Sequence, residues 1–366
     1  MWSAGRSSGE RHGAVPVHRR PGCPAKAGHP LPVGRGPVED VAMTVDWSRL
    51  GHAYGRATDT PGHVAALEFG DADARQAALD HLDIAVLHQG FPRTATAPTV
   101  RAVTALLAEG RAHPDTIEPL LEFLGDAATS VTDLADNRYF AGILPDLADA
   151  VAQAYPVVLP LLAASPPDRA LLRAENLVAI ARLRSVADRR EELAVLVLEW
   201  SERGAGPQAE WLRCLGQLGV DLRDRLTDPD PAIRLRAALA HEDAPGAREL
   251  ILAALAGPPP PGVHQFALVA AAIRVAADFD EIATAACQVA GRDSWAGFDD
   301  GWGALVRFAF PKPYAPHRPL TEPQRALVRA LVTNDQLWDS TNGSCRLVFT
   351  RAGLPSTRSA CGRLAG

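Results

Sequence analysis

The chain has 366 residues, and 47% of them are hydrophobic, so it is long enough to bury one large core or several smaller ones. Only 6% are aromatic, so the core must consist mainly of Leu, Ala and Val, a composition that favours packed helices over sheets. The net charge of −6 argues against nucleic acid as the main partner. We therefore expect an all-α protein.

The cysteines and the apolar runs bear on the cellular compartment of the protein. The five cysteines are scattered and contain no Cys-x-x-Cys pair, which is typical of reduced thiols and not of a disulfide framework or a zinc site. The longest apolar run, residues 154–163, is shorter than the ~20 residues that a membrane-spanning helix needs, and Pro156 and Pro160 interrupt it. We expect a cytoplasmic protein with no membrane segment, no metal and no cofactor.

Residues 1–42 differ from the rest of the chain. They are rich in Gly, Pro, Arg and His and lack apolar periodicity, so they are predicted to be disordered. A second hypothesis is that they are not translated and that the natural protein starts at Met43, where helical patterning begins. The expected organisation is thus an N-terminal extension over 1–42, a helical repeat array over 43–333 and a C-terminal capping segment over 334–366.

From Met43 onward one helical pattern follows another. Short Gly/Pro turns separate the predicted helices, and helix pairs recur at ~30 to 45 residues, which is typical of an α-solenoid. The alternative is a compact globule of ordinary amphipathic helices. Two intervals, 126–145 and 293–302, are irregular. The predicted helices cover residues 46–54, 61–67, 71–88, 97–108, 116–127, 147–164, 168–183, 188–202, 207–218, 231–241, 247–256, 264–277, 279–289, 304–310 and 322–332.

The clearest repeat motif lies in the stretch 227–241. Asp230 is a good N-cap, Pro231 falls at the first helical position, and the alanines that follow would let a neighbouring helix approach closely. The stretch resembles the second helix of a HEAT repeat, in which an Asp opens the turn and a Val/Ile-Arg pair follows. That resemblance implies an α-α superhelix of the HEAT/armadillo type, with Asp–Arg pairs between successive repeats. The motif residues are Asp228, Asp230, Pro231, Ile233 and Arg234.

A second set of motifs lies in the N-terminal half and near the C-terminus. The motifs are His52-Ala-Tyr-Gly55, Ala57, Asp59, Pro61, His88-Gln-Gly90, Ala95-Thr-Ala-Pro98 and Gly353-Leu-Pro355. They resemble those of an actinobacterial group of HEAT-repeat proteins, and the resemblance covers essentially Met43 to the C-terminus. Members are mostly uncharacterised, so the resemblance implies a fold and no activity. Phe91-Pro92 departs from the pattern, which usually has a small residue and an aromatic one there.

Four histidines could suggest a metal or acid–base site. His81 and His88 lie two turns apart on one predicted helix, and His52 and His63 are nearby in sequence. The spacing lacks the i, i+4 pair of a zincin. We favour a structural role, in which partly buried histidines hydrogen-bond loop carbonyls and Gly90 caps the helix.

The irregular intervals supply the candidate interaction surface. Tyr139, a loop aromatic beside acidic residues, is one candidate, and the others are Trp295, Asp299, Asp300 and Trp302. Carboxylates among tryptophans could stack a base or a sugar, as in the HEAT-like alkylpurine DNA glycosylases. The surrounding motifs of those enzymes are missing, and the acidic balance opposes phosphate binding. The alternative is that the two tryptophans close the end of the array.

The sequence therefore favours a non-catalytic, monomeric scaffold that grips an unidentified protein partner on its concave face. Two other hypotheses stay open. One is an enzyme of the HEAT-like glycosylase or lyase type. The other is an immunity-type neutraliser of a toxin or effector.

Overall fold

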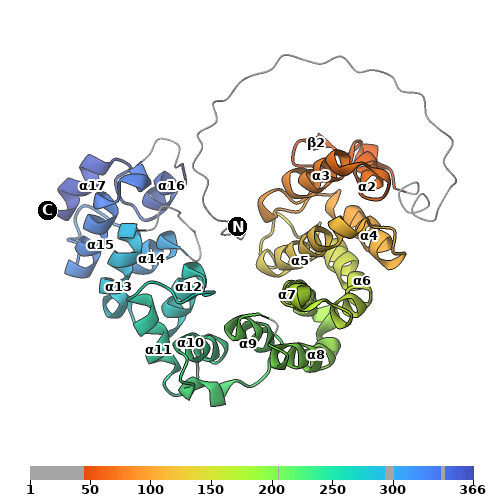
Figure 1. Cartoon of the computed structure of the whole chain (residues 1–366). Helices are drawn as coiled ribbons and strands as arrows, with labels where there is room; N and C mark the ends of the chain where they lie inside the picture. Colours follow the sequence, from red (N-terminus) through yellow and green to blue (C-terminus); the bar gives the residue numbers. More distant parts are fainter. Residues whose placement is uncertain (1–44, 205, 293–300, 339–342) are drawn as a thin grey trace. The chain divides into compact units, whose positions relative to one another are not determined.

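The computed structural model describes residues 45–204, 206–292, 301–338 and 343–366, so the predicted disorder of residues 1–42 lies outside the described part. Within it the chain is all-α apart from one two-stranded antiparallel sheet. The chain divides into two compact units. Figure 1 shows its helices coloured along the sequence. Unit 1 comprises the described residues up to Leu161 together with Ala179–Ala187, and unit 2 comprises Leu162–Val178 and Asp188–Gly366.

In unit 1 a small hairpin precedes a set of helices. Helix α2 packs against α3 and α4, and α4 packs against α5. The elements are the 3-10 helix η1 (Trp47–Arg49), β1 (Gly51–His52), β2 (Gly55–Arg56), α2 (Thr60–Phe69), α3 (Ala72–His81), the π-helix η2 (Leu82–Val86), the 3-10 helix η3 (His88–Gly90), α4 (Thr96–Ala108), the 3-10 helix η4 (Pro114–Thr116), α5 (Ile117–Asp133) and most of α6 (Leu144–Ala163).

The hairpin replaces the helix predicted over 46–54. That prediction is wrong beyond Arg49, because Gly55 has a φ of 140°, a conformation open mainly to glycine, and turns the chain back on itself. His52 pairs with Gly55 across the two strands. The hairpin is fixed to the helices by two backbone bonds, from Ala53 N–H to Ala85 O (2.9 Å) and from Ala95 N–H to Gly51 O (3.1 Å).

Helix α6 is the one helix of the described chain that is long and apolar enough to cross a membrane, with a mean hydropathy of 1.2 over its apolar window. The helix continues through Pro156 and Pro160, as the predicted helix over 147–164 requires. Its apolar stripe, which includes Leu147 and Val151, is buried in the protein.

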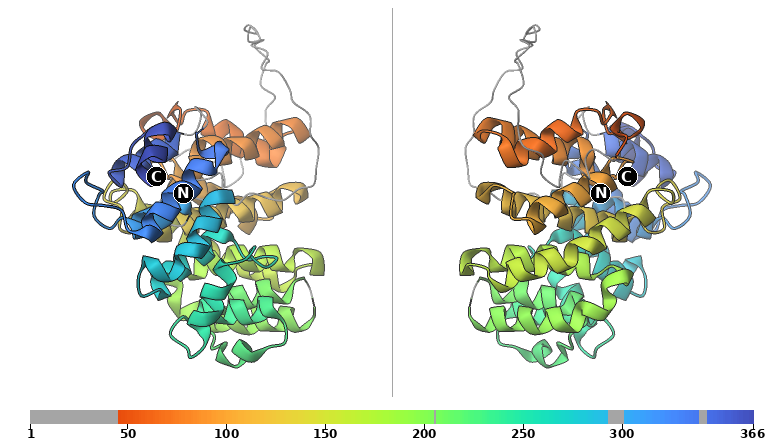
Figure 2. Two further views of the ribbon diagram at one scale, coloured as in Figure 1. Left: turned by 90° about the vertical axis from the view of Figure 1, so that its left-hand side faces the viewer. Right: turned by 90° about the vertical axis from the view of Figure 1, so that its right-hand side faces the viewer.

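Unit 2 is built of helices that pack in chain order. Each of α8 to α11 contacts the next, α12 contacts α14, and further contacts join α11 to α13, α13 to α15 and α15 to α17. These helices are the green and blue segments of Figure 2. The elements are most of α7 (Pro167–Ala181), α8 (Arg190–Glu202), α9 (Gln208–Gln217), η6 (Arg223–Thr227), α10 (Pro231–Ala240), α11 (Ala247–Leu255), α12 (Gln265–Val275), α13 (Phe279–Arg292), α14 (Trp302–Ala309), α15 (Glu322–Thr333), η7 (Asp335–Trp338), α16 (Gly343–Arg351) and α17 (Arg358–Ala365).

The C-terminal segment belongs to the packing of unit 2. Helices α16 and α17 were not predicted, because each is short and carries few apolar residues. They nevertheless pack on α14 and α15, respectively, and the Asn334 side chain donates to the Ala290 carbonyl oxygen (2.9 Å). Residues 334–366 are thus not a separate body.

The repeat motif forms the helix start that the sequence predicts. The Asp230 side chain accepts a hydrogen bond from the Ala232 N–H (2.8 Å), and Pro231 is the first residue of α10. Arg234, however, donates to the carbonyl oxygens of Asp228 (2.7 Å) and Pro229 (3.0 Å). The motif arginine therefore stabilises its own turn, and within the described residues it makes no ion pair with an aspartate of another helix.

Other residues connect the helices of unit 2. Arg236 of α10, only 5% exposed, donates to Glu210 of α9 (2.6 Å) and to the Gly262 carbonyl oxygen. Arg213 of α9 bonds the other oxygen of Glu210 (2.9 Å) and also pairs with Glu175 of α7. This buried Glu–Arg ladder takes the place of the pairs expected from Asp228 and Arg234.

Candidate functional site

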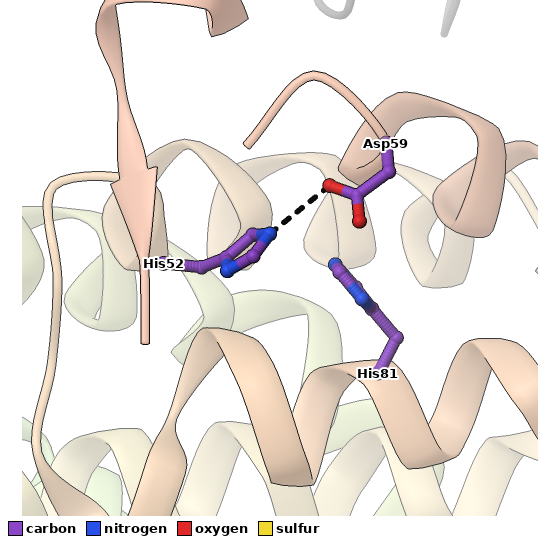
Figure 3. Close-up of side chains that lie close together, drawn as sticks. All are labelled: His52, Asp59 and His81. Carbon is purple, nitrogen blue, oxygen red and sulfur yellow. Dashed lines mark hydrogen bonds and ion pairs between the residues drawn. The ribbon is translucent and has the colours of Figure 1, made fainter. Parts of the chain in front are cut away.

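The motifs of the N-terminal half converge in space around His52. His52 comes from β1, Asp59 precedes α2, and His81 is the last residue of α3 (Figure 3). The carboxylate and imidazole atoms that could bind a metal lie within 4.8 Å of one another. Three short segments therefore bring two imidazoles and a carboxylate to one point.

The orientation of the His52 ring is fixed from both sides. Its Nδ1 atom lies 3.1 Å from the Tyr54 backbone N, and its Nε2 atom lies 3.1 Å from Oδ1 of Asp59. A backbone N–H can only donate, so Nδ1 accepts, and Nε2 carries the proton that it donates to the carboxylate. Burial alone would raise the pKa of Asp59, but a backbone hydrogen bond and the bond from His52 outweigh it and lower the pKa.

His81 is the buried member of the cluster. Its Nε2 atom lies 3.0 Å from the Thr60 hydroxyl oxygen, and its ring stacks on His63 with centroids 4.1 Å apart. The His52 ring meets it edge-on at 5.3 Å. Burial, reinforced by the charge of His63, lowers the pKa of His81 to about 4, so its imidazole is neutral at neutral pH.

The chain after His81 has an irregular backbone. The π-helix η2 interrupts the predicted helix over 71–88, and Gln89 has a φ of 53°, the one positive value of a non-glycine residue in the described chain. The His88 Nδ1 atom donates to the Ile84 carbonyl oxygen (2.8 Å), a carbonyl of η2 and not of a loop. The predicted bonding to loop carbonyls is wrong for His52 and His81, which bond to Asp59 and Thr60. Local irregularity of this kind is concentrated at functional sites.

A row of aromatic rings adjoins the cluster, and we call it the aromatic strip. The rings of Tyr54 and His88 meet edge-on at 5.6 Å, and the rings of Phe91 and Phe140 stack at 5.7 Å. The Phe91 N–H donates to the His88 carbonyl oxygen (3.0 Å), so the two ring pairs are linked through the backbone. Tyr139 is the chain neighbour of Phe140. The strip therefore consists of Tyr54, His88, Phe91, Phe140 and Tyr139.

Both tyrosines of the strip face solvent. Tyr54 is 66% exposed and Tyr139 is 79% exposed. The Tyr139 backbone N–H donates to the Asn137 side chain (3.1 Å), and the Arg138 guanidinium lies 5.5 Å from the Tyr139 ring centroid. The turn that carries Tyr139 is therefore held by its own neighbours.

The predicted interaction residues have different fates. Tyr139 is exposed, as an interaction residue must be. Trp302 is fully buried and packs against Phe349 with ring centroids 5.8 Å apart, so its assignment to an exposed surface is wrong. Trp295, Asp299 and Asp300 lie outside the described residues.

The close contact of His52 with Asp59 and His81 was not predicted from the sequence. The sequence interpretation paired His81 with His88 because they share a helical stripe, whereas the structure brings His81 to His52 and His63 and leaves His88 beside Tyr54. The sequence signal that could have indicated the cluster was Asp59. It lies seven residues after His52 and directly before the Thr-Pro start of α2.

Comparison of the chain with protein-family models, with curated proteins and with solved structures gives no match.

Proposed function

We propose that the protein is a non-catalytic, HEAT-like helical-repeat module of the cytoplasm that binds a protein partner through the aromatic strip of unit 1. The observation that carries this proposal is the exposure of Tyr54 and Tyr139, the first in ring contact with His88 and the second next in the chain to Phe140, which stacks on Phe91. Tyrosine is enriched among the residues that dominate protein–protein binding energy, because it offers a large apolar face and a polar tip.

The contact pattern supports a repeat array. In both units helices contact their sequence neighbours, and several also contact the next helix but one, as stacked helix pairs do. Arginines connect such neighbours: Arg248 of α11 pairs with Glu281 of α13, and Arg274 of α12 pairs with Glu242 before α11 (2.5 Å). The sequence resemblance to HEAT repeats agrees with this organisation.

The charges beside the strip favour a particular kind of partner. Asp83 follows the cluster on η2, and Asp133 and Asp136 precede the Tyr139 turn; all three are exposed. Arg138 is occupied by its contact with Tyr139. We therefore propose a partner surface that offers aliphatic side chains to the rings and arginine or lysine to the aspartates.

The test is affinity capture from the native host with the wild-type chain and with the double variant Tyr54→Ala/Tyr139→Ala. The matched control is Phe69→Ala, because Phe69 lies on α2 of the same unit, is 68% exposed and is outside the strip. We expect one partner to be recovered with wild type and Phe69→Ala and to be lost with the double variant. Equal recovery with all three chains would disprove a role of the strip.

The structure bears differently on the enzyme hypothesis and on the neutraliser hypothesis. The glycosylase or lyase hypothesis depended on tryptophans in an open groove, and the burial of Trp302 removes one of them. Neutralisation of a toxin or effector is a special case of partner binding, and identification of the captured partner would distinguish it.

A further inference from the structure

We propose that His52, Asp59 and His81 bind a divalent transition-metal ion of the Zn²⁺ class, and that binding moves the hairpin turn that carries Tyr54. This inference goes beyond the proposed partner binding and is independent of it. It rests on the juxtaposition of three donor groups from β1, the start of α2 and the end of α3.

The distances suit a small ion. Zinc holds nitrogen and oxygen ligands at about 2.0 to 2.2 Å, so two ligand atoms of a tetrahedral site lie about 3.4 Å apart. His52 Nε2 and Asp59 Oδ1 are already 3.1 Å apart, and the His81 donor is within 4.8 Å of both. Rotation of the side chains, without rearrangement of the helices, closes the remaining distance.

The donor set selects the class of ion. Two imidazoles and one carboxylate suit Zn²⁺, Co²⁺, Ni²⁺ and Cu²⁺, whereas Mg²⁺ and Ca²⁺ prefer oxygen ligands throughout. Asp59 is 53% exposed at its side chain and His52 is 6% exposed, so the site is closed on the hairpin side and open at the carboxylate. The fourth coordination position is thus left to water or to an incoming ligand.

The neighbours of His81 restrict its ring. The His63 ring stacks on one face of it, the His52 ring lies edge-on to it, and the Thr60 hydroxyl is in hydrogen-bond distance of Nε2. Stacking and edge-on contacts hold the plane of the ring, so it loses little freedom when it binds a metal, and coordination through Nε2 would replace the Thr60 bond to that atom. The buried histidine is therefore suited to anchor the ion.

The tautomer of His52 couples the site to Tyr54. Coordination requires the lone pair of Nε2, so the proton of the neutral ring must move from Nε2 to Nδ1. Nδ1–H would then face the Tyr54 N–H across 3.1 Å, and two donors at that distance repel each other. The Tyr54 peptide has to turn away, and Gly55, which adopts a φ of 140°, provides a flexible neighbour for this movement.

The experiment uses the full chain, freed of metal with a chelator and labelled with ¹⁵N-tyrosine. The chain has 4 tyrosines (Tyr54, Tyr139, Tyr155 and Tyr314), so the amide spectrum contains few signals. ZnCl₂ is titrated in while heat and the spectrum are recorded, and MgCl₂ serves as the comparison. We expect Zn²⁺ to bind, Mg²⁺ not to bind, and the Tyr54 signal to shift far more than that of Tyr139.

Variants of the ligand residues test whether the heat of Zn²⁺ binding comes from the cluster of His52, Asp59 and His81. His81→Gln and Asp59→Asn should each weaken Zn²⁺ binding by at least about tenfold. Asp59 is exposed, so Asp59→Asn tests the site even where a change at buried His81 disturbs folding. His113→Gln is the matched control, because His113 forms a histidine–aspartate pair with Asp115 in the same unit, without a second histidine near it in the described chain.

The outcomes separate the parts of the proposal. Absence of Zn²⁺ binding to wild type, or unchanged affinity in both cluster variants, overturns the site. Zinc binding that depends on the cluster but leaves the Tyr54 signal in place overturns the coupling to the hairpin. Because capture of a protein partner is measured separately, failure of the metal site leaves the proposed function standing, and the reverse holds as well.

Discussion

Gly216 of α9 lies directly against Ala240 of α10. A β-carbon at Gly216 would come within 2.8 Å of the Cβ atom of Ala240, closer than two such carbons can pack. A glycine inside a helix costs about 1 kcal/mol relative to alanine, so its presence here needs a reason. The reason is the close approach of two helices, which the alanine-rich sequence of α10 predicts.

The contact between Gly216 and Ala240 predicts whether alanine at position 216 raises or lowers the stability of the protein. In an open helix position Gly→Ala would stabilise the protein, but we expect Gly216→Ala to lower the free energy of unfolding by about 1 to 3 kcal/mol because it overpacks the interface. Urea denaturation monitored by circular dichroism measures this change. The control is Gly291→Ala in α13, a helix position where the added carbon meets only open space. A stabilised Gly216→Ala variant would contradict the close packing.

A second glycine tests the buried ladder. Gly262 has a φ of 79°, and a β-carbon there would collide with the Glu210 carboxylate. We expect Gly262→Ala to cost about 2 to 3 kcal/mol, since it combines backbone strain with displacement of a charged group. Gly246→Ala is the matched control, because Gly246 has a φ of 84° with open space around it and should show the strain alone. Equal losses of unfolding free energy in both variants, measured by urea denaturation, would show that the Glu–Arg ladder does not require the close approach of Gly262 to Glu210.

Much of the helical framework follows from local sequence. Asp230 and Pro231 start α10 where capping chemistry predicts, and Asp71 caps α3 by accepting from the Ala74 N–H (2.9 Å). The hairpin was not predictable from periodicity, because strands of two residues have none. It is determined instead by Gly55 and by tertiary bonds to Gly51 and Ala53.

The candidate site was less accessible from the sequence. His52, Asp59 and His81 lie on three segments, and their meeting depends on how the hairpin packs on α3, which no single-helix pattern contains. Tyr139 could be singled out because an aromatic residue in an irregular acidic interval has little reason to be buried. Trp302 was misjudged by the same argument, since its helix packs into the core of unit 2.

The Glu–Arg ladder predicts a pH dependence of stability. Burial alone would raise the pKa of Glu210, but hydrogen bonds from Arg213 and the charge of Arg236 outweigh it and lower the pKa below the ordinary value of 4.5. The folded state therefore binds fewer protons than the unfolded state as the pH falls past 4.5, so the contribution of Glu210 is complete above that pH and is lost in more acidic solution.

The matching experiment compares wild type with Glu210→Gln. We expect the variant to be less stable at pH 7, because it leaves Arg236 buried with a weakened partner, and to lose less stability between pH 5 and pH 3. Glu175 acts in the opposite sense, because burial raises its pKa, so only the difference between the two chains isolates Glu210. Urea midpoints across this pH range provide the measurement. Parallel acid losses in both chains would refute the role of this carboxylate.

Trp302 offers the last prediction, since its burial assigns it to the core of unit 2 rather than to a binding surface. Its ring is fully buried beside Phe349, and its Nε1 atom makes no hydrogen bond to the described residues. Trp302→Ala should therefore cost about 3 to 5 kcal/mol through the cavity it leaves, whereas Trp302→Phe, which sacrifices no hydrogen bond, should cost clearly less. Both are measured by urea denaturation. If Trp302 belonged to a binding surface, its variants would have normal stability and would lose the partner in the capture assay. Retention of the partner by Trp302→Phe would therefore support a core role for the ring.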